Sequence, residues 1–169
     1  MAAVAAIPSF TLKAVAPGAP FDGMPLTLDG PFVGLNSTGT VARFYATGIE
    51  DSFSWSLHGY PTGIVDEPAL LVGDNTYRFA FLPQPEETSK SYGPRMMMDG
   101  WSFNIGRPSA KIAPATGKFL SYNFEHRWYA FPAQEQGQWT VMWWDGSCCV
   151  TAVGIPLKLQ LSEVDPRSY

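Results

Sequence analysis

The sequence predicts an all-β protein, a single antiparallel β-sandwich or β-barrel of about nine strands. Three observations support this fold class. Apolar and polar residues alternate with a period of two along most of the chain. Turn dipeptides separate the alternating segments, and no stretch longer than about ten residues shows the periodicity of an amphipathic helix. The chain of 169 residues is long enough for one domain with an ordinary hydrophobic core.

Each alternating segment places its large apolar residues on one face. In 53–59, for example, Phe53, Trp55 and Leu57 alternate with serines and His58. The segments follow one another at the spacing of strands in sandwiches and barrels. In chain order they are 10–15, 41–47, 53–59, 77–82, 101–106, 118–124, 126–131, 138–144 and 156–164.

The turns between these strands are marked by Asp-Gly pairs, because glycine adopts positive φ at little cost. These pairs are Asp22-Gly23, Asp29-Gly30, Asp99-Gly100 and Asp145-Gly146. The polar segment 84–95 is predicted to be a surface loop. Residues 9–169 are therefore expected to form one domain. Residues 1–8 are expected to be a flexible N-terminus, either the remnant of a signal peptide or a plain cytosolic start.

Composition excludes several classes of function. The net charge is −4, and the basic residues are scattered singly, so we expect no nucleic-acid partner. No window approaches eighteen consecutive apolar residues, and we expect no membrane insertion. The chain has no zinc-type spacing of Cys and His and no nucleotide-binding motif, so we expect neither a metal nor a cofactor.

Three consecutive methionines, Met96 to Met98, break the alternation. They cannot all point into one core, so at least one must lie on the opposite face of its strand. The simpler explanation is a strand that is buried on both sides, or a methionine under a loop. The alternative is an adaptable apolar wall for a hydrophobic ligand.

The charged triplet Glu125, His126 and Arg127 is the second break, and it stands between two aromatic runs. Under an enzyme hypothesis, His126 is the acid or base, and Glu125, Arg127, Tyr129 and Asp99 supply further polar groups. The alternative is a hairpin corner with an ordinary surface ion pair. Adjacent strand residues point to opposite faces, so Glu125 and Arg127 would share a face and His126 would not.

The candidate ligand contacts are large apolar side chains near these breaks. They are Trp128, Trp101, Met98, Met142 and Trp144. Both faces of 138–144 are largely apolar, which predicts a central strand that is covered on both sides or borders a cavity. The adjacent Cys148 and Cys149 are predicted to be structural thiols. A vicinal disulfide and a catalytic thiol are the alternatives.

Two parts of the chain resemble a known family. The segment 9–36 is similar to the start of small secreted fungal cell-wall proteins, a family that includes the phialide-associated cell-wall protein and related IgE-binding allergens. Arg127-Trp128-Tyr129-Ala130 and a late cysteine-containing strand resemble their C-terminal pattern. The chain has Phe131 where that family tends to carry a cysteine, so a long-range disulfide is lost there. The resemblance implies a secreted all-β domain without established catalysis.

Two classes of function stay open. The first is a secreted or wall-associated domain that binds a glycan or a small hydrophobic molecule without catalysis, with Tyr60, Tyr92 or Trp144 stacking on sugars. The second is a small cofactor-independent cyclase or isomerase of fungal specialised metabolism, with a cytoplasmic location as the alternative to secretion. It would hold its substrate in an apolar cavity. A closed cavity would favour the enzyme, and a solid core would favour the binding domain.

Overall fold

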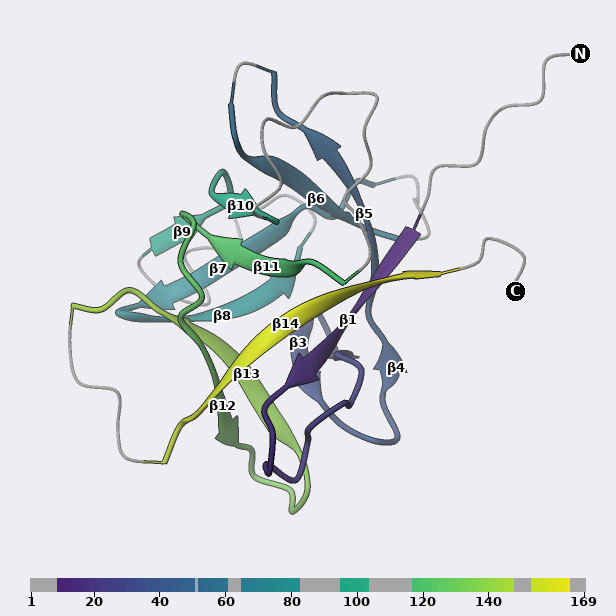
Figure 1. Ribbon diagram of the computed structural model, residues 1–169, viewed down its shortest axis with the longest axis vertical. Coiled ribbons are helices and arrows are strands. Elements are labelled where there is room, and N and C mark those ends of the chain that lie inside the picture. Colours follow the sequence, from purple (N-terminus) through teal and green to yellow (C-terminus); the bar gives the residue numbers. More distant parts are fainter. Residues whose placement is uncertain are drawn as a thin grey trace, which may run out of the picture.

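The computed structural model describes residues 9–50, 52–60, 65–82, 95–103, 117–147 and 153–164. These residues contain no helix, and they form fourteen strands joined by antiparallel pairings (Figure 1). The all-β prediction is confirmed, whereas the predicted number of about nine strands was too low. The strands are β1 (Ser9–Val15), β2 (Thr27–Asp29), β3 (Phe32–Leu35), β4 (Thr40–Val41), β5 (Arg43–Gly48), β6 (Trp55–Gly59), β7 (Ala69–Asp74), β8 (Thr76–Phe81), β9 (Arg95–Met97), β10 (Trp101–Ser102), β11 (Phe119–Tyr122), β12 (Trp128–Pro132), β13 (Trp139–Trp144) and β14 (Ile155–Val164).

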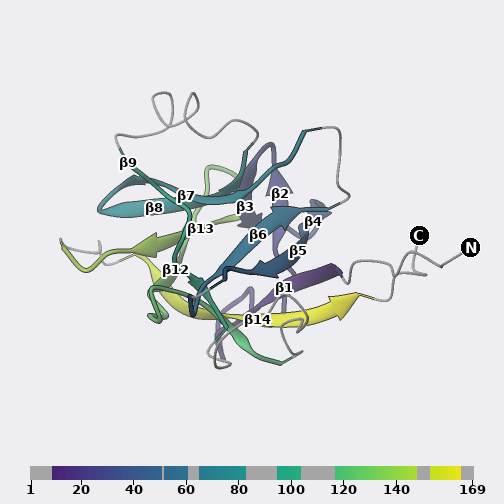
Figure 2. The same ribbon diagram turned by 90° about the horizontal axis from the view of Figure 1, so that it is seen from above.

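A closed antiparallel barrel organises the fold. It is formed by β1, β5, β6, β10, β11 and β14, and it closes because β1 pairs with both β5 and β14. Outer strands extend it: β12, β13, β3, β8, β7 and β9 continue from β14, β2 pairs with β3, and β4 pairs with β2. Figure 2 shows β7, β8 and β13 on one side of the molecule and β1 and β14 on the other.

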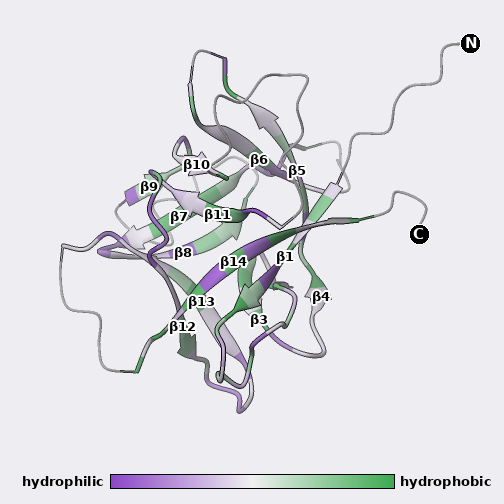
Figure 3. Ribbon diagram, in the orientation of Figure 1, coloured by the Kyte–Doolittle hydropathy of each residue, from purple (hydrophilic) through white to green (hydrophobic). Residues whose placement is uncertain are grey.

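Strand β14 belongs to both parts of the sheet. Its first residues pair with β12, with Leu157 opposite Trp128, and its later residues pair with β1 and β11. Leu157, Leu159 and Leu161 are buried, and the residues between them face outward, as the alternation predicted. Figure 3 shows the same alternation of hydrophobic and hydrophilic residues along β14.

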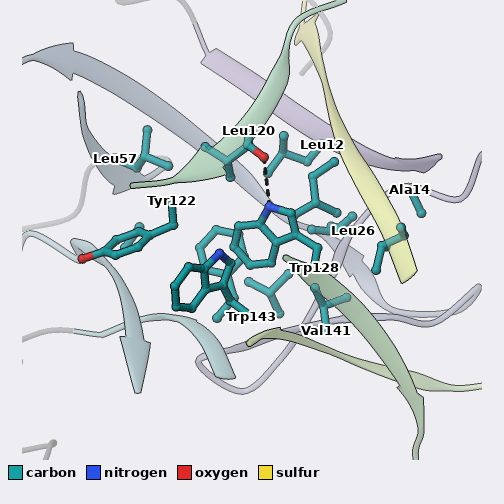
Figure 4. Close-up of a cluster of buried hydrophobic side chains, with 14 of the residues drawn as sticks. Leu12, Ala14, Leu26, Leu57, Leu120, Tyr122, Trp128, Val141 and Trp143 are labelled. Carbon is teal, nitrogen blue, oxygen red and sulfur yellow. Dashed lines mark hydrogen bonds between the residues drawn. The ribbon is translucent and has the colours of Figure 1, made fainter. Parts of the chain in front are cut away.

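The core is an aromatic cluster between the two sides of the fold. Trp128 is fully buried, and its indole Nε1 donates a hydrogen bond to the Leu120 carbonyl at 2.9 Å (Figure 4). Its ring is stacked on Trp101, with centroids 6.3 Å apart and an interplanar angle of 9°. Trp101 donates in turn to the Ala69 carbonyl at 3.2 Å. The indole N–H groups of Trp128 and Trp101 thus each have an acceptor inside the core, which offsets the cost of removing them from water.

A second, smaller cluster covers the opposite face of β7 and β8. It contains Phe32, Leu70, Val72, Ala80 and Leu82, and Met96 and Met98 pack against it. Met97 packs instead against the main core. The methionine segment therefore has apolar contacts on both faces, and its three methionines are partly buried, which supports the simpler interpretation.

Strand β7 was absent from the predicted strands because both of its faces are buried. Ala69 and Leu71 point into the main core, and Leu70 and Val72 point into the second cluster. A strand of this kind reads as a continuous apolar run and shows no alternation. The predicted placement of Phe53 was also wrong: it precedes β6 and is 48% exposed.

Candidate functional site

An open apolar hollow lies on the outer side of β14, where this strand passes from one part of the sheet to the other. Its volume is about 410 Å³, and a neighbouring volume of about 390 Å³ shares Ala16, Pro17 and Pro156 with it. Both volumes fall in the range of small-molecule sites, about 300–1,000 Å³. We call this region the outer hollow; it is lined by Val15, Ala16, Pro17, Phe119, His126, Pro156, Leu157 and Lys158.

Two basic side chains border the apolar floor of the outer hollow. The imidazole of His126 lies edge-on to Phe119, with ring centroids 6.4 Å apart. The Nζ of Lys158 lies 5.4 Å from the centroid of the same ring. Phe119 therefore forms an apolar surface between a potential cation and a group that can donate or accept a hydrogen bond.

The other members of the charged triplet point away from His126. Glu125 and Arg127 form an ion pair at 2.8 Å, and Arg127 also donates to the Asp145 carbonyl at 2.5 Å. The chain turns immediately before them at Asn123 and Phe124, both of which have positive φ. Two such residues form the type I′ turn of a tight hairpin. The hairpin corner is therefore the interpretation that the geometry supports for Glu125 and Arg127.

Asp99 lies beside a different group, the phenol of Tyr122. Burial, and then the negative charge of Asp99, raise the pKa of Tyr122 to about 12. Tyr122 also packs edge-on against Trp101 and Trp143. Asp99 is thus not brought together with His126, and the proposed catalytic set is divided among separate places.

Three further candidates lie on the outer face of β12 and β13. Tyr129 is paired with Met142 across the two strands, and its ring is perpendicular to that of Trp144 at 6.1 Å. All three side chains are partly buried. They form a small apolar patch in which the two rings are not coplanar, unlike a flat platform for stacking on sugars.

The remaining ligand candidates are core residues. Trp101 and Trp128 are both fully buried, so neither reaches the outer hollow. Met98 packs against the second cluster. Central strand β13 is buried on its inner face through Val141 and Trp143 and partly buried on its outer face, as predicted for 138–144. Tyr92, Cys148 and Cys149 lie outside the described residues.

A polar constellation that was not predicted lies on the outer face of β6. The Ser56 Oγ is 2.8 Å from the Nε2 of His58, and the His58 Nδ1 is 2.8 Å from an Asp66 carboxylate oxygen. The sequence contained one signal for it, the Ser-x-His spacing, which puts both side chains on one face of a strand. The position of Asp66 depends on how the chain returns beside β6, and this was not readable from the sequence.

Two absences can be stated for the described part of the chain. It contains no group of three or more His, Cys, Asp or Glu side chains placed to hold a metal ion. No helix with the length and apolar composition needed to cross a bilayer occurs in it either.

Comparison with known proteins gives no relative. No protein-family model matches the chain, and neither a curated protein nor a solved structure matches it.

Proposed function

We propose that this protein is a binding domain for a small hydrophobic molecule, and that the outer hollow is the site. The observation that carries the proposal is an apolar concavity of about 410 Å³ that opens outside a core filled with packed aromatic side chains. Packed aromatic side chains fill much of the described core, and this supports binding on the outside over catalysis in a closed cavity. A secreted or cell-wall location remains part of the proposal, on the family resemblance alone.

The lining residues indicate how such a molecule is held. Pro17, Phe119 and Pro156 offer rigid apolar surface, so the ligand would be bound mainly by removal of apolar area from water, at about 25 cal/mol per Å². Lys158 and His126 at the border would orient a ligand that carries an anionic or hydrogen-bonding group. No chemical step is assigned to the hollow.

Titration with 1-anilinonaphthalene-8-sulfonate, an aromatic sulfonate whose fluorescence rises in apolar sites, tests the proposal. We expect saturable binding to the folded protein and a loss of affinity of at least about tenfold in Pro156→Asp, because the new carboxylate would lie in the apolar floor and repel the anion. Pro132→Asp is the matched control. Pro132 is also an exposed strand proline, but it is the last residue of β12 and does not line the outer hollow. Non-saturable binding, or equal affinity in both variants, would refute the site.

A further inference from the structure

The constellation on β6 has the connectivity of a nucleophile, a base and an orienting carboxylate. Ser56 and His58 are two residues apart on one strand, and they face outward opposite Thr47 and Tyr45 of β5. Ser56 lies between the buried core residues Trp55 and Leu57, and His58 directly follows Leu57. The packing of these two core residues holds the strand in place. The positions of the serine and the histidine are therefore set by a rigid element.

The third member is held in place by the backbone. Gly59 N–H donates to the Glu67 carbonyl at 2.9 Å, and His58 forms an isolated bridge with Pro68. These contacts hold the segment before β7 beside β6 and place Asp66 at the far side of the imidazole. Its two carboxylate oxygens lie 2.8 and 2.9 Å from the His58 Nδ1.

The hydrogen bonds assign the roles in a neutral imidazole. A carboxylate only accepts, so the proton on the ring lies on Nδ1 and is donated to Asp66. The Nε2 lone pair then accepts the hydroxyl proton of Ser56. Tyr45 stacks on the imidazole at 4.8 Å with an interplanar angle of 14°, which limits rotation of the ring. The side chains of His58 and Asp66 are 17% and 56% exposed, so a small molecule can approach from solvent.

The geometry points to Ser56 as an acylatable nucleophile, activated by His58 and oriented through Asp66, that reacts with small activated carboxylic esters. The Ser56 Oγ attacks the ester carbonyl carbon as its proton moves to the His58 Nε2. The carbon–oxygen bond to the leaving group then breaks, and the leaving group takes that proton. Water attacks the acyl carbon, the bond to Oγ breaks, and the carboxylic acid and the free serine result. Activated esters are the expected class, because their carbonyl carbon is readily attacked by the activated hydroxyl and their leaving group departs readily.

Covalent labelling tests this inference. With diisopropyl fluorophosphate, the Ser56 Oγ would form a bond to phosphorus, the phosphorus–fluorine bond would break, and HF would leave. We expect the label at Ser56, located by peptide mass spectrometry, and release of p-nitrophenol from p-nitrophenyl acetate. Ser56→Ala should abolish both, and Asp66→Asn should slow both at least about tenfold, since the amide would favour the wrong imidazole tautomer.

Controls separate chemistry from a structural role. Ser54→Ala removes a serine next to the start of the same strand and should leave labelling unchanged. Pro132→Asp should also leave it unchanged, because Pro132 lies on β12, outside this constellation. Circular dichroism and thermal unfolding report whether each variant folds, and Ser56→Ala alone decides the inference if Asp66→Asn is unfolded. Absence of labelling in the folded wild type, or labelling that persists in Ser56→Ala, would overturn it and leave the constellation as a clamp between β6 and the segment before β7.

Discussion

Replacing Trp128 with phenylalanine tests whether the aromatic core is as closely packed as the structure indicates. Trp128 is fully buried, donates to the Leu120 carbonyl at 2.9 Å and stacks on Trp101. Phenylalanine keeps an aromatic ring but removes the donor and part of the ring volume. The lost hydrogen bond costs about 1 kcal/mol, and the unfilled volume costs about 1–2 kcal/mol more. We therefore expect a loss of about 2–3 kcal/mol in the free energy of unfolding, which corresponds to a decrease in Tm of about 4–12 °C.

Trp144→Phe is the matched control for this prediction. Trp144 lies on the outer face of β13, is only partly buried, and has no hydrogen-bond partner for its Nε1 among the described residues. The same substitution should cost less than about 1 kcal/mol there. Urea denaturation followed by circular dichroism, with unchanged m-values, measures both variants. A Trp128→Phe variant within about 0.5 kcal/mol of wild type, or equal losses in the two variants, would show that the core does not depend on this contact.

Three further predictions concern turns and ionisation. Gly146 has φ +85°, and an added Cβ would displace the Arg127 guanidinium, which donates to the Asp145 carbonyl. Gly137 has a similar φ of +82° but open space around it. Gly146→Ala should therefore cost about 1 kcal/mol more than Gly137→Ala by urea denaturation, and equal losses would refute this. Phe124 is 56% exposed with φ 63°, so Phe124→Gly should relieve left-handed strain and stabilise the protein by about 0.5–1 kcal/mol; a lowered Tm would contradict this. The folded-state pKa of Tyr122 is raised to about 12 from 10.0, so its neutral form contributes stability that is fully present below pH 10 and is lost as the pH rises toward 12. Tyr122→Phe should therefore lose less stability than wild type over this interval, which unfolding curves at pH 9 to 12 would measure; parallel losses would exclude Tyr122 as the cause.

The fold was readable from the sequence wherever a strand has one buried face and one solvated face. In β14, the alternation of Leu157, Leu159 and Leu161 with polar residues reports directly which side is buried. Strand β7 was not readable, because its two buried faces remove the alternation. The short strands β2, β4 and β9 contain too few residues to show a period.

The site was readable only in part, because chemistry depends on which residues meet across the fold. The sequence placed Glu125 and Arg127 on one face and His126 on the other. In the structure Glu125 and Arg127 form an ion pair with each other, and His126 lines the outer hollow. The sequence did not indicate that His126 would border the outer hollow. That hollow is formed by β1, β11 and β14, which are far apart in the sequence. Under the enzyme hypothesis Asp99 belonged to the same site as His126, and in the structure it lies beside Tyr122.

The sequence by itself determined that this protein is all-β, that turns lie at pairs such as Asp22-Gly23 and Asp29-Gly30, and which residues of the longer strands point inward. Those properties are local, since they follow from side-chain spacing and from the conformational freedom of individual glycines. Only the tertiary structure decided that Ser56, His58 and Asp66 form one hydrogen-bonded constellation. Asp66 is separated from His58 along the chain, and its position depends on the backbone contacts that hold the returning segment beside β6. Long-range pairing of this kind depends on the packing of the whole domain, which no short stretch of sequence specifies.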